Sequence, residues 1–274
     1  MDFASRYESH PWDSQYHVNY TKEEHQTWHF LYQRQIQILE GRAVPQYIEG
    51  LKKLAFSQTH IPQIADVNLA LQAYSHWQVR PVQCVISPQE FFTMLGQAHF
   101  PVATFIRRAE DIDYITEPDI FHELFGHIPL YTVPEYAHFV QSYAKLALTY
   151  PEKDWNLFLR LFWFTVEFGL IQTAEGMRIY GGGILSSYKE TKTCLERDDA
   201  IRAYFDPVSV LRTGYRIDVL QNIYYVISDF KELFHMIDID FRKIIARAQE
   251  LGKFPALYPP KNAEEGQKTN KAKQ

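Results

Sequence analysis

The chain has 274 residues and a formal net charge of −5, from 28 lysines and arginines against 33 aspartates and glutamates. This mildly acidic balance argues against nucleic acid as a partner, because affinity for a phosphate backbone depends on positive charge. No apolar run reaches the ~18 residues that a membrane-spanning helix needs, and the first residues lack the basic and apolar regions of a signal peptide. The two cysteines, Cys84 and Cys194, form neither a disulfide framework nor a CxxC metal motif, so we expect a cytoplasmic protein with no membrane partner.

The predicted elements are mostly helices, each opened by a proline or by a capping box. In chain order they span 21–40, 87–95, 134–147 and 151–166. Short runs of β-branched or aromatic residues at 82–86, 102–106 and 215–219 predict small strands. Long strands do not alternate with helices, so the pattern does not call for a parallel sheet. We therefore predict a mainly α fold of packed helices with a few short strands.

The C-terminal residues differ from the rest of the chain. Residues 259–274 contain almost no apolar side chain, and four lysines stand against two glutamates. Such a segment buries too little surface to offset the entropy of ordering it, so we predict a disordered polar tail. No other stretch has the composition of a linker, and we expect residues 1–258 to form one domain.

A short helix is predicted around His122, beginning at Pro118 and ending at Gly126, with Pro129 preventing its continuation. It carries two histidines that lie five residues apart, His122 and His127. The HExxH motif of zinc peptidases has a four-residue spacing, which puts both rings on one face. A five-residue spacing rotates the second ring by roughly 140° on an ideal α-helix. If both rings bind one ion, the backbone must leave α-helical geometry between them, and Gly126 accepts backbone angles that other residues avoid.

Glu167 is the third candidate ligand, because it lies on the apolar face of its predicted helix. Burying a carboxylate there costs several kcal/mol of desolvation free energy, to order of magnitude, unless the carboxylate is paired or bound to a cation. Arg160 and Arg178 are available as ordinary ion-pair partners. Two imidazoles and one carboxylate are also the ligand set of non-haem Fe(II) oxygenases. The residues alone leave both interpretations open, because single histidines are often satisfied in a protein core.

Three segments, 117–130, 163–170 and 180–187, closely resemble the pterin-dependent aromatic amino acid hydroxylases in sequence, order and spacing. The resemblance covers roughly residues 75–240 and is closest to the bacterial-type members that act on phenylalanine. It implies a monooxygenase with an iron site in a central cleft, which uses Fe(II), a tetrahydropterin and O₂ to convert L-phenylalanine into L-tyrosine. Val226 also resembles the phenylalanine-specific members. Hydroxylation of tryptophan or another aromatic amino acid by the same chemistry stays open.

The resemblance also implies roles for individual residues. The iron ligands, and with them the catalytic centre, correspond to His122, His127 and Glu167. Arg107 corresponds to the residue that binds the substrate carboxylate, and its guanidinium group suits bidentate binding of a carboxylate. The remaining substrate contacts correspond to Pro118, Trp163, Gly183 and Ser186. The pterin contacts correspond to Phe91, Glu123 and Phe162, and many family members have tyrosine in place of Phe162.

Animal members of this family carry an N-terminal regulatory domain and a C-terminal oligomerisation helix. The sequence shows neither, so we expect a monomer or homodimer whose ligands are small molecules. Two other classes of function remain as alternatives. A metal-dependent hydrolase on the same ligands would work with Zn²⁺ and without O₂. A non-enzymatic helical interaction module would keep both histidines in its core and bind no stoichiometric metal.

Overall fold

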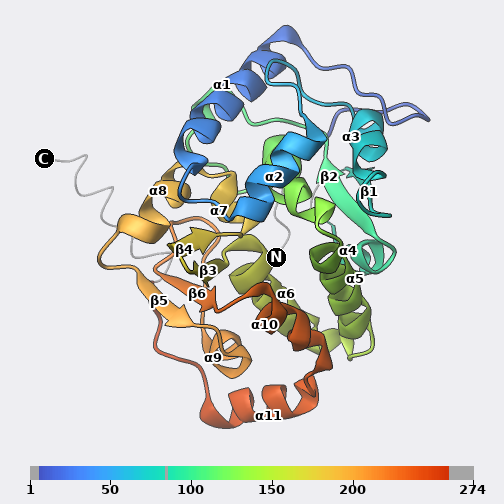
Figure 1. Ribbon diagram of the computed structural model, residues 1–274. Helices are drawn as coiled ribbons and strands as arrows, with labels where there is room; N and C mark the ends of the chain where they lie inside the picture. The colour runs from blue at the N-terminus through green and yellow to red at the C-terminus, as the bar shows by residue number, and fades with distance from the viewer. Residues whose placement is uncertain (1–5, 84–85, 259–274) are drawn as a thin grey trace, which may run out of the picture.

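A computed structural model describes residues 6–83 and 86–258, and it is mainly helical as predicted (Figure 1). The α-helices of these residues are α1 (Lys22–Leu39), α2 (Pro45–Leu54), α3 (Ile64–Leu71), α4 (Pro88–Gly96), α5 (Pro134–Leu148), α6 (Trp155–Phe162), α7 (Gly182–Leu185), α8 (Tyr188–Glu196), α9 (Pro207–Arg212), α10 (Phe230–Phe234) and α11 (Phe241–Leu251). The 3₁₀ and π turns are η1 (Ala109–Asp111), η2 (His122–His127), η3 (Ile128–Thr132), η4 (Glu152–Asp154), η5 (Trp163–Glu167) and η6 (His235–Asp238).

Two small sheets accompany the helices. Strands β1 (Gln78–Val82) and β2 (His99–Ala103) pair in parallel. The second sheet has the order β4-β3-β6-β5, from β3 (Leu170–Thr173), β4 (Gly176–Ile179), β5 (Ile201–Tyr204) and β6 (Ile223–Ile227). Its β3–β4 pair is antiparallel, whereas β3–β6 and β5–β6 are parallel. Parallel pairing was not expected, and strands of four or five residues are too short to show it as a repeating sequence pattern.

The predicted helix starts are largely confirmed. Thr21 caps α1 through a complete capping box with Glu24, and Ser87 accepts the backbone N–H of Glu90 at the start of α4. Pro134 occupies the first turn of α5. The segment after Pro151 differs from the prediction, because a 3₁₀ turn precedes α6 and a π-helix follows it.

The predicted strands are less accurate. β1 ends at Val82 and β2 ends at Ala103, so each overlaps only the beginning of its predicted run. The strand predicted at 215–219 is wrong, and this stretch is an irregular loop. Its Tyr215 stacks on Trp163 with ring centroids 4.7 Å apart, so this ring packs against the π-helix η5 rather than along a sheet. The tail predicted at 259–274 lies outside the described residues.

The hydrophobic core is one continuous cluster that extends from α1 to α11, and many of its largest buried side chains are aromatic. Figure 1 shows α1 and α11 at opposite ends of the molecule, with the larger sheet between them. A second, small cluster consists of Tyr7, Ala103 and Phe105, with Ile115 packed against it. None of the helices in the described ranges combines the length and apolarity needed to span a membrane.

Candidate metal centre and substrate cavity

Two π-helices carry the candidate metal ligands. η2 begins at His122 and ends at His127, and η5 ends at Glu167. π-Helices bond each residue to the fifth one along and occur mostly as single turns, frequently at functional sites. The backbone N–H of Phe168 accordingly donates to the carbonyl of Trp163 at 2.8 Å. The prediction that the backbone leaves α-helical geometry between the two histidines is therefore confirmed.

The predicted start of this helix and the predicted role of Gly126 are both wrong. Pro118 lies before the helix, and the Asp119 carboxylate accepts the backbone N–H of His122 at 2.9 Å. Gly126 is not among the residues with positive φ. A Cβ atom on Gly126 would instead lie 2.6 Å from the carbonyl oxygen of Gly182, so its small size permits close packing of η2 against α7.

The three candidate ligand atoms converge. The Nε2 atoms of His122 and His127 lie 3.1 Å apart, and Oε2 of Glu167 lies 3.7 Å from the first and 3.3 Å from the second. Three atoms with these separations can all lie about 2.1 Å from one central ion, which is a normal distance for histidine and carboxylate ligands. The resulting arrangement occupies one face of the ion and leaves positions open on the other, as in non-haem iron centres. The residues therefore fit a divalent iron.

The protonation states suit metal binding. Burial lowers the pKa of His122 to about 4, so its ring is neutral at physiological pH. Although burial opposes ionisation of Glu167, the neighbouring His127 holds the pKa of that carboxyl below its ordinary value. Glu123 offers another carboxylate oxygen within 4.8 Å of the ligand atoms of both histidines. Burial and the charge of Glu167 raise the pKa of Glu123 well above its ordinary value, which weakens Glu123 as a metal ligand relative to Glu167.

Ser186 fixes the orientation and tautomer of His122. Its hydroxyl donates to the carbonyl of Gly182 at 2.9 Å, so its oxygen accepts the Nδ1–H of His122, also at 2.9 Å. That bond leaves the lone pair of Nε2 directed at the candidate metal position. Gly182 also lies against the second histidine, because a Cβ atom there would be 2.4 Å from Nδ1 of His127.

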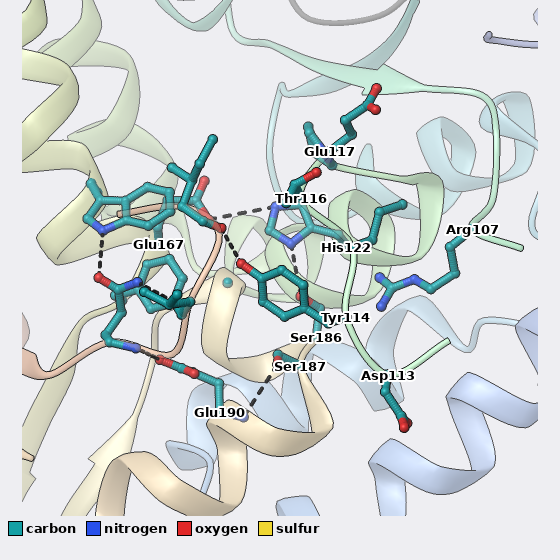
Figure 2. Close-up of a pocket in the computed structure, with 18 residues that line it drawn as sticks. Arg107, Asp113, Tyr114, Thr116, Glu117, His122, Glu167, Ser186, Ser187 and Glu190 are labelled. Carbon is teal, nitrogen blue, oxygen red and sulfur yellow. Dashed lines mark hydrogen bonds and ion pairs between the residues drawn. The ribbon is translucent and has the colours of Figure 1, made fainter. Parts of the chain in front are cut away.

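A cavity opens beside the ligands, with an empty volume of about 830 Å³ including the solvent-exposed mouth. Its walls contain the five residues predicted to bind substrate, together with two of the three candidate ligands: Arg107, Pro118, Trp163, Gly183, Ser186, His122 and Glu167. Trp163 packs on Phe168 with ring centroids 4.4 Å apart, which gives the cavity an aromatic wall. Residues from distant parts of the sequence are thus brought to one site (Figure 2).

Arg107 is 5% exposed, and Asp119 holds it in a buried ion pair. Its Nε and Nη2 atoms each lie 2.8 Å from a carboxylate oxygen of Asp119, which also accepts the Arg107 backbone N–H at 2.9 Å. The Arg107 guanidinium group is expected to bind the substrate carboxylate, but two of its nitrogens already bind Asp119. Its other nitrogen, Nη1, has no hydrogen-bond partner in the part of the chain that the structure describes, and the side chain lines the cavity.

Glu190 is a cavity residue that the sequence did not reveal. It is 3% exposed, and its Oε1 accepts the backbone N–H of Gln221 at 2.9 Å and the hydroxyl of Tyr224 at 2.7 Å. Burial raises the pKa of Glu190 to about 7. In Figure 2, Arg107 and Glu190 reach toward the cavity from opposite sides. Glu190 lies in the first turn of α8, where Ser187 accepts its backbone N–H, and the sequence assigned it no role.

Two of the three predicted pterin residues form a pair, and the third lies elsewhere. Phe91 and Phe162 meet edge to face with ring centroids 5.1 Å apart. Neither ring is among the residues that line the substrate cavity, and Glu123 is not among them either. The structure thus places two of the predicted pterin contacts together on α4 and α6, while Glu123 lies beside the candidate ligands.

Comparison with known proteins gives consistent matches over nearly the whole chain. A family model for biopterin-dependent aromatic amino acid hydroxylases matches residues 2–254. A phenylalanine-4-hydroxylase of Pseudomonas aeruginosa is 45% identical over 246 residues, which are 90% of this chain and 94% of the relative. A structure of phenylalanine hydroxylase from Legionella pneumophila is 48% identical with a TM-score of 0.89, covering 92% of this chain and all of the other.

A structure of phenylalanine hydroxylase from Chromobacterium violaceum contains bound iron(III) and 7,8-dihydrobiopterin. It is 37% identical to this chain with a TM-score of 0.83, and the match covers 92% of this chain and 93% of the other. The same fold in that relative therefore holds both the metal and the pterin.

Proposed function

The chain belongs to the family of biopterin-dependent aromatic amino acid hydroxylases, and we propose that it converts L-phenylalanine into L-tyrosine with Fe(II), a tetrahydropterin and O₂. Curated relatives from Pseudomonas aeruginosa and Vibrio cholerae, at 45% and 41% identity, are phenylalanine-4-hydroxylases. When bound, the iron and the pterin together activate O₂ for insertion into an aromatic C–H bond. Family membership argues against the metal-dependent hydrolase and the interaction module that the sequence alone left open.

His122, His127 and Glu167 are the proposed iron ligands. The convergence of their three ligand atoms within 3.1 to 3.7 Å is the observation that carries this proposal. Two neutral rings and one carboxylate reduce the charge of a ferrous ion to about one. Ser186 keeps His122 in the ligating tautomer, and Gly182 gives the ring of His127 its space. The protein thereby holds the metal on one side and leaves the other side facing the cavity.

The cavity is proposed to bind phenylalanine as a zwitterion. Arg107 donates from Nη1 to the substrate carboxylate, and Asp119 keeps the guanidinium in place from behind. Glu190 accepts the substrate ammonium with Oε2, because the bonds from Gln221 and Tyr224 both use Oε1. Fixing both charged groups orients the ring relative to the metal.

Pro118, Trp163 and Gly183 are proposed to form the wall around the substrate ring. A side chain on Gly183 would meet the ring of Phe168 at 2.9 Å and so narrow the cavity. Apolar and aromatic walls exclude water from the reacting carbon and allow the substrate ring to stack. Phe91, Glu123 and Phe162 are the proposed pterin contacts, with the edge-to-face pair of Phe91 and Phe162 offering an aromatic surface.

Three broader properties are also part of the proposal. Residues 1–258 form one catalytic domain, which the continuous core between α1 and α11 supports. The enzyme acts in the cytoplasm, in keeping with a chain that carries only two cysteines, of which Cys194 is a buried free thiol. It works as a monomer or homodimer, and size-exclusion chromatography with light scattering distinguishes these two states.

Product analysis tests the function directly. The protein is stripped of metal, loaded anaerobically with one equivalent of Fe(II), and then supplied with phenylalanine, a tetrahydropterin and O₂. Tyrosine should form in step with pterin consumption, and only in the presence of O₂. A sample loaded with Zn²⁺ is the control and should be inactive. Absence of tyrosine while iron is bound stoichiometrically would overturn the proposal, and parallel assays with tryptophan test the alternative substrate.

A further inference from the structure

The cavity wall that carries Arg107 is anchored in two places, because Ile106 belongs to the main core and Phe105 belongs to the small separate cluster. Residues 105–118 carry this wall, in which Arg107 and residues 113–118 line the cavity. Ile115 packs against the small separate cluster. The central member of that cluster is Tyr7, which is 6% exposed and more than ninety residues away in the sequence. A contact between the N-terminal segment and the substrate wall is therefore part of the fold.

Tyr7 contacts the chain on both sides of Arg107. Its ring stacks on Phe105, two residues before, with centroids 4.7 Å apart and planes inclined by 10°. Its hydroxyl accepts the backbone N–H of Arg108 at 3.2 Å and donates to the Asp111 carboxylate. The N–H of Arg108 belongs to the peptide group whose carbonyl is that of Arg107, so this bond fixes the backbone directly at the arginine.

The segment around Tyr7 is itself attached at its C-terminal end. Ser9 donates from Oγ to the carbonyl of Val82 at 2.8 Å and accepts the backbone N–H of Thr104 at 3.0 Å. The Thr104 hydroxyl in turn donates to the carbonyl of His10 at 2.8 Å. These bonds tie the segment to both strands of the small sheet.

At the other end of the segment, Arg6 reaches the cavity wall. Its backbone N–H donates to Oε1 of Glu117 at 3.0 Å, and its Nη2 lies 3.0 Å from a carboxylate oxygen of Asp111. Glu117 lines the cavity. Residues 6–10, which we call the strap, therefore connect β1 and β2 with the outer wall of the substrate site.

We propose that Tyr7 is a positioning residue for substrate binding, which holds the Arg107 backbone so that its guanidinium meets the substrate carboxylate. The inference rests on the proposed function and extends it to a segment remote from the ligands. Asp119 fixes the charged end of Arg107 and its backbone N–H, and Tyr7 holds the peptide group on the other side of the same residue. Without Tyr7, the wall loses both a stacked ring and the partner of a backbone N–H, and the backbone at Arg107 keeps only its bond to Asp119.

Steady-state kinetics of the iron-loaded enzyme test this role. Tyr7→Ala should raise the KM for phenylalanine about tenfold, because small displacements of an orienting group weaken substrate binding strongly. The KM for the pterin and the bound iron should change less than about twofold, since Tyr7 contacts neither group. Tyr7→Phe keeps the stacked ring and removes the hydroxyl, so it should raise the KM about threefold. Glu8→Ala, at an exposed position of the same strap, is the control and should match the parent enzyme.

The same substitution in an Arg107→Ala background separates positioning from general stability. If Tyr7 acts through Arg107, Tyr7→Ala should no longer change the KM for phenylalanine once that arginine is absent. Persistence of the full effect in this background would overturn the inference, as would an equal rise in the KM for the pterin. An unchanged KM in Tyr7→Ala would overturn it too. Should Tyr7→Ala fail to fold, Tyr7→Phe decides by the same criteria. A parent enzyme that forms no tyrosine would instead refute the proposed function.

Discussion

The metal centre and the substrate wall are built in different ways. The candidate ligands lie on two π-helices inside the main core. A Cβ atom added to Gly126 or Gly182 would lie less than 3 Å from neighbouring atoms, so there is no room for added atoms around the ligands. The substrate wall at 105–118 is mostly irregular and places only Ile106 in the main core. Polar contacts hold the rest of it, from the strap, from Asp119, from Arg34 on α1, and from Tyr114 to the opposite loop. Changes in the first region should therefore affect metal binding, and changes in the second should affect the KM for phenylalanine.

This difference follows from packing. A close-packed interior transmits a displacement to its neighbours, whereas a loop held by a few polar bonds can shift locally. The two regions share the cavity but should respond separately to substitution. This difference would be contradicted by a substitution near the ligands that mainly raises the KM for phenylalanine. It would also be contradicted by a substitution in the substrate wall that mainly lowers iron affinity.

Loss of a ligand should have the largest effect. Glu167→Ala removes the carboxylate. Loss of a residue that hydrogen-bonds to a metal ligand typically lowers metal affinity about 10- to 100-fold, and we expect loss of the ligand itself to lower iron affinity by more than this. Tyrosine formation should fall with it. Metal analysis after gel filtration measures the iron content. The exposed Glu175→Ala is the matched control, and a full equivalent of iron in Glu167→Ala would refute the ligand assignment.

Crowding of a ligand ring should have the next largest effect. In Gly182→Ala the new Cβ would lie 2.4 Å from Nδ1 of His127, so the ring or α7 must move. We expect iron affinity to fall about 10- to 100-fold and stability to drop by about 1–3 kcal/mol. Iron titration and thermal unfolding measure these changes. Gly214→Ala, whose Cβ would have nothing within 4 Å, should change neither, and a normal iron affinity in Gly182→Ala would contradict the packing argument.

Glu190→Gln should change the pH dependence of substrate binding. Because burial raises the pKa of Glu190 to about 7, the carboxyl becomes charged as the pH rises from 6 to 8. The KM for phenylalanine should therefore fall about tenfold over this range in the parent enzyme, following the charged fraction. The glutamine variant should show a flat profile with a high KM. Retention of the slope in the variant would show that another group binds the ammonium.

The raised pKa of Glu190 also predicts that the protein becomes less stable as the pH rises, whereas substrate binding becomes tighter. The folded protein retains the proton of Glu190 to higher pH than the unfolded chain, whose glutamate pKa is near 4.5. Ionisation of Glu190 therefore lowers stability as the pH rises from about 4.5 to about 7. Glu190→Gln should remove this contribution, so its Tm should fall less than that of the parent enzyme across the same interval.

Removal of one loop contact should have the smallest effect. The Tyr114 hydroxyl donates to the carbonyl of Ile217, which joins the two loops that line the cavity. Tyr114→Phe deletes this single bond, and one hydrogen bond contributes about 1 kcal/mol. We expect the KM for phenylalanine to rise less than about fivefold and the iron content to stay unchanged. Loss of iron in this variant would show that the two regions are not separate.

Sequence spacing indicates the backbone geometry around the candidate ligands better than it indicates how the cavity is built. The five-residue separation of His122 and His127 indicates a departure from α-helical geometry, but it does not identify a π-helix. Gly126 was correctly singled out for an incorrect reason, because its close contact with Gly182 depends on tertiary packing. The helical face predicted around Glu167 is only partly present, because the π-helix ends at Glu167 and the following apolar residues Leu170 and Ile171 lie in β3.

The unpredicted residues owe their roles to partners far away in the sequence. Asp119 suits a helix N-terminus, and nothing local shows that it also binds the Arg107 fork. Glu190 completes a capping-box pattern with Ser187, yet its carboxylate binds Gln221 and Tyr224 instead. A sequence pattern identifies which residues begin a helix, but it does not show which of them a remote loop will bury.

The short helix α7 contacts both candidate histidine ligands. Its Gly182 carbonyl anchors Ser186, which orients His122, while the Cα of the same glycine lies against the ring of His127. The angle between the two rings is consequently set by one turn of backbone rather than by two independent supports. Substitutions at Gly182 and Ser186 should therefore be non-additive in their effect on metal affinity. The metal preference of this enzyme can in principle be altered by exchanging that turn, with all three ligands left in place.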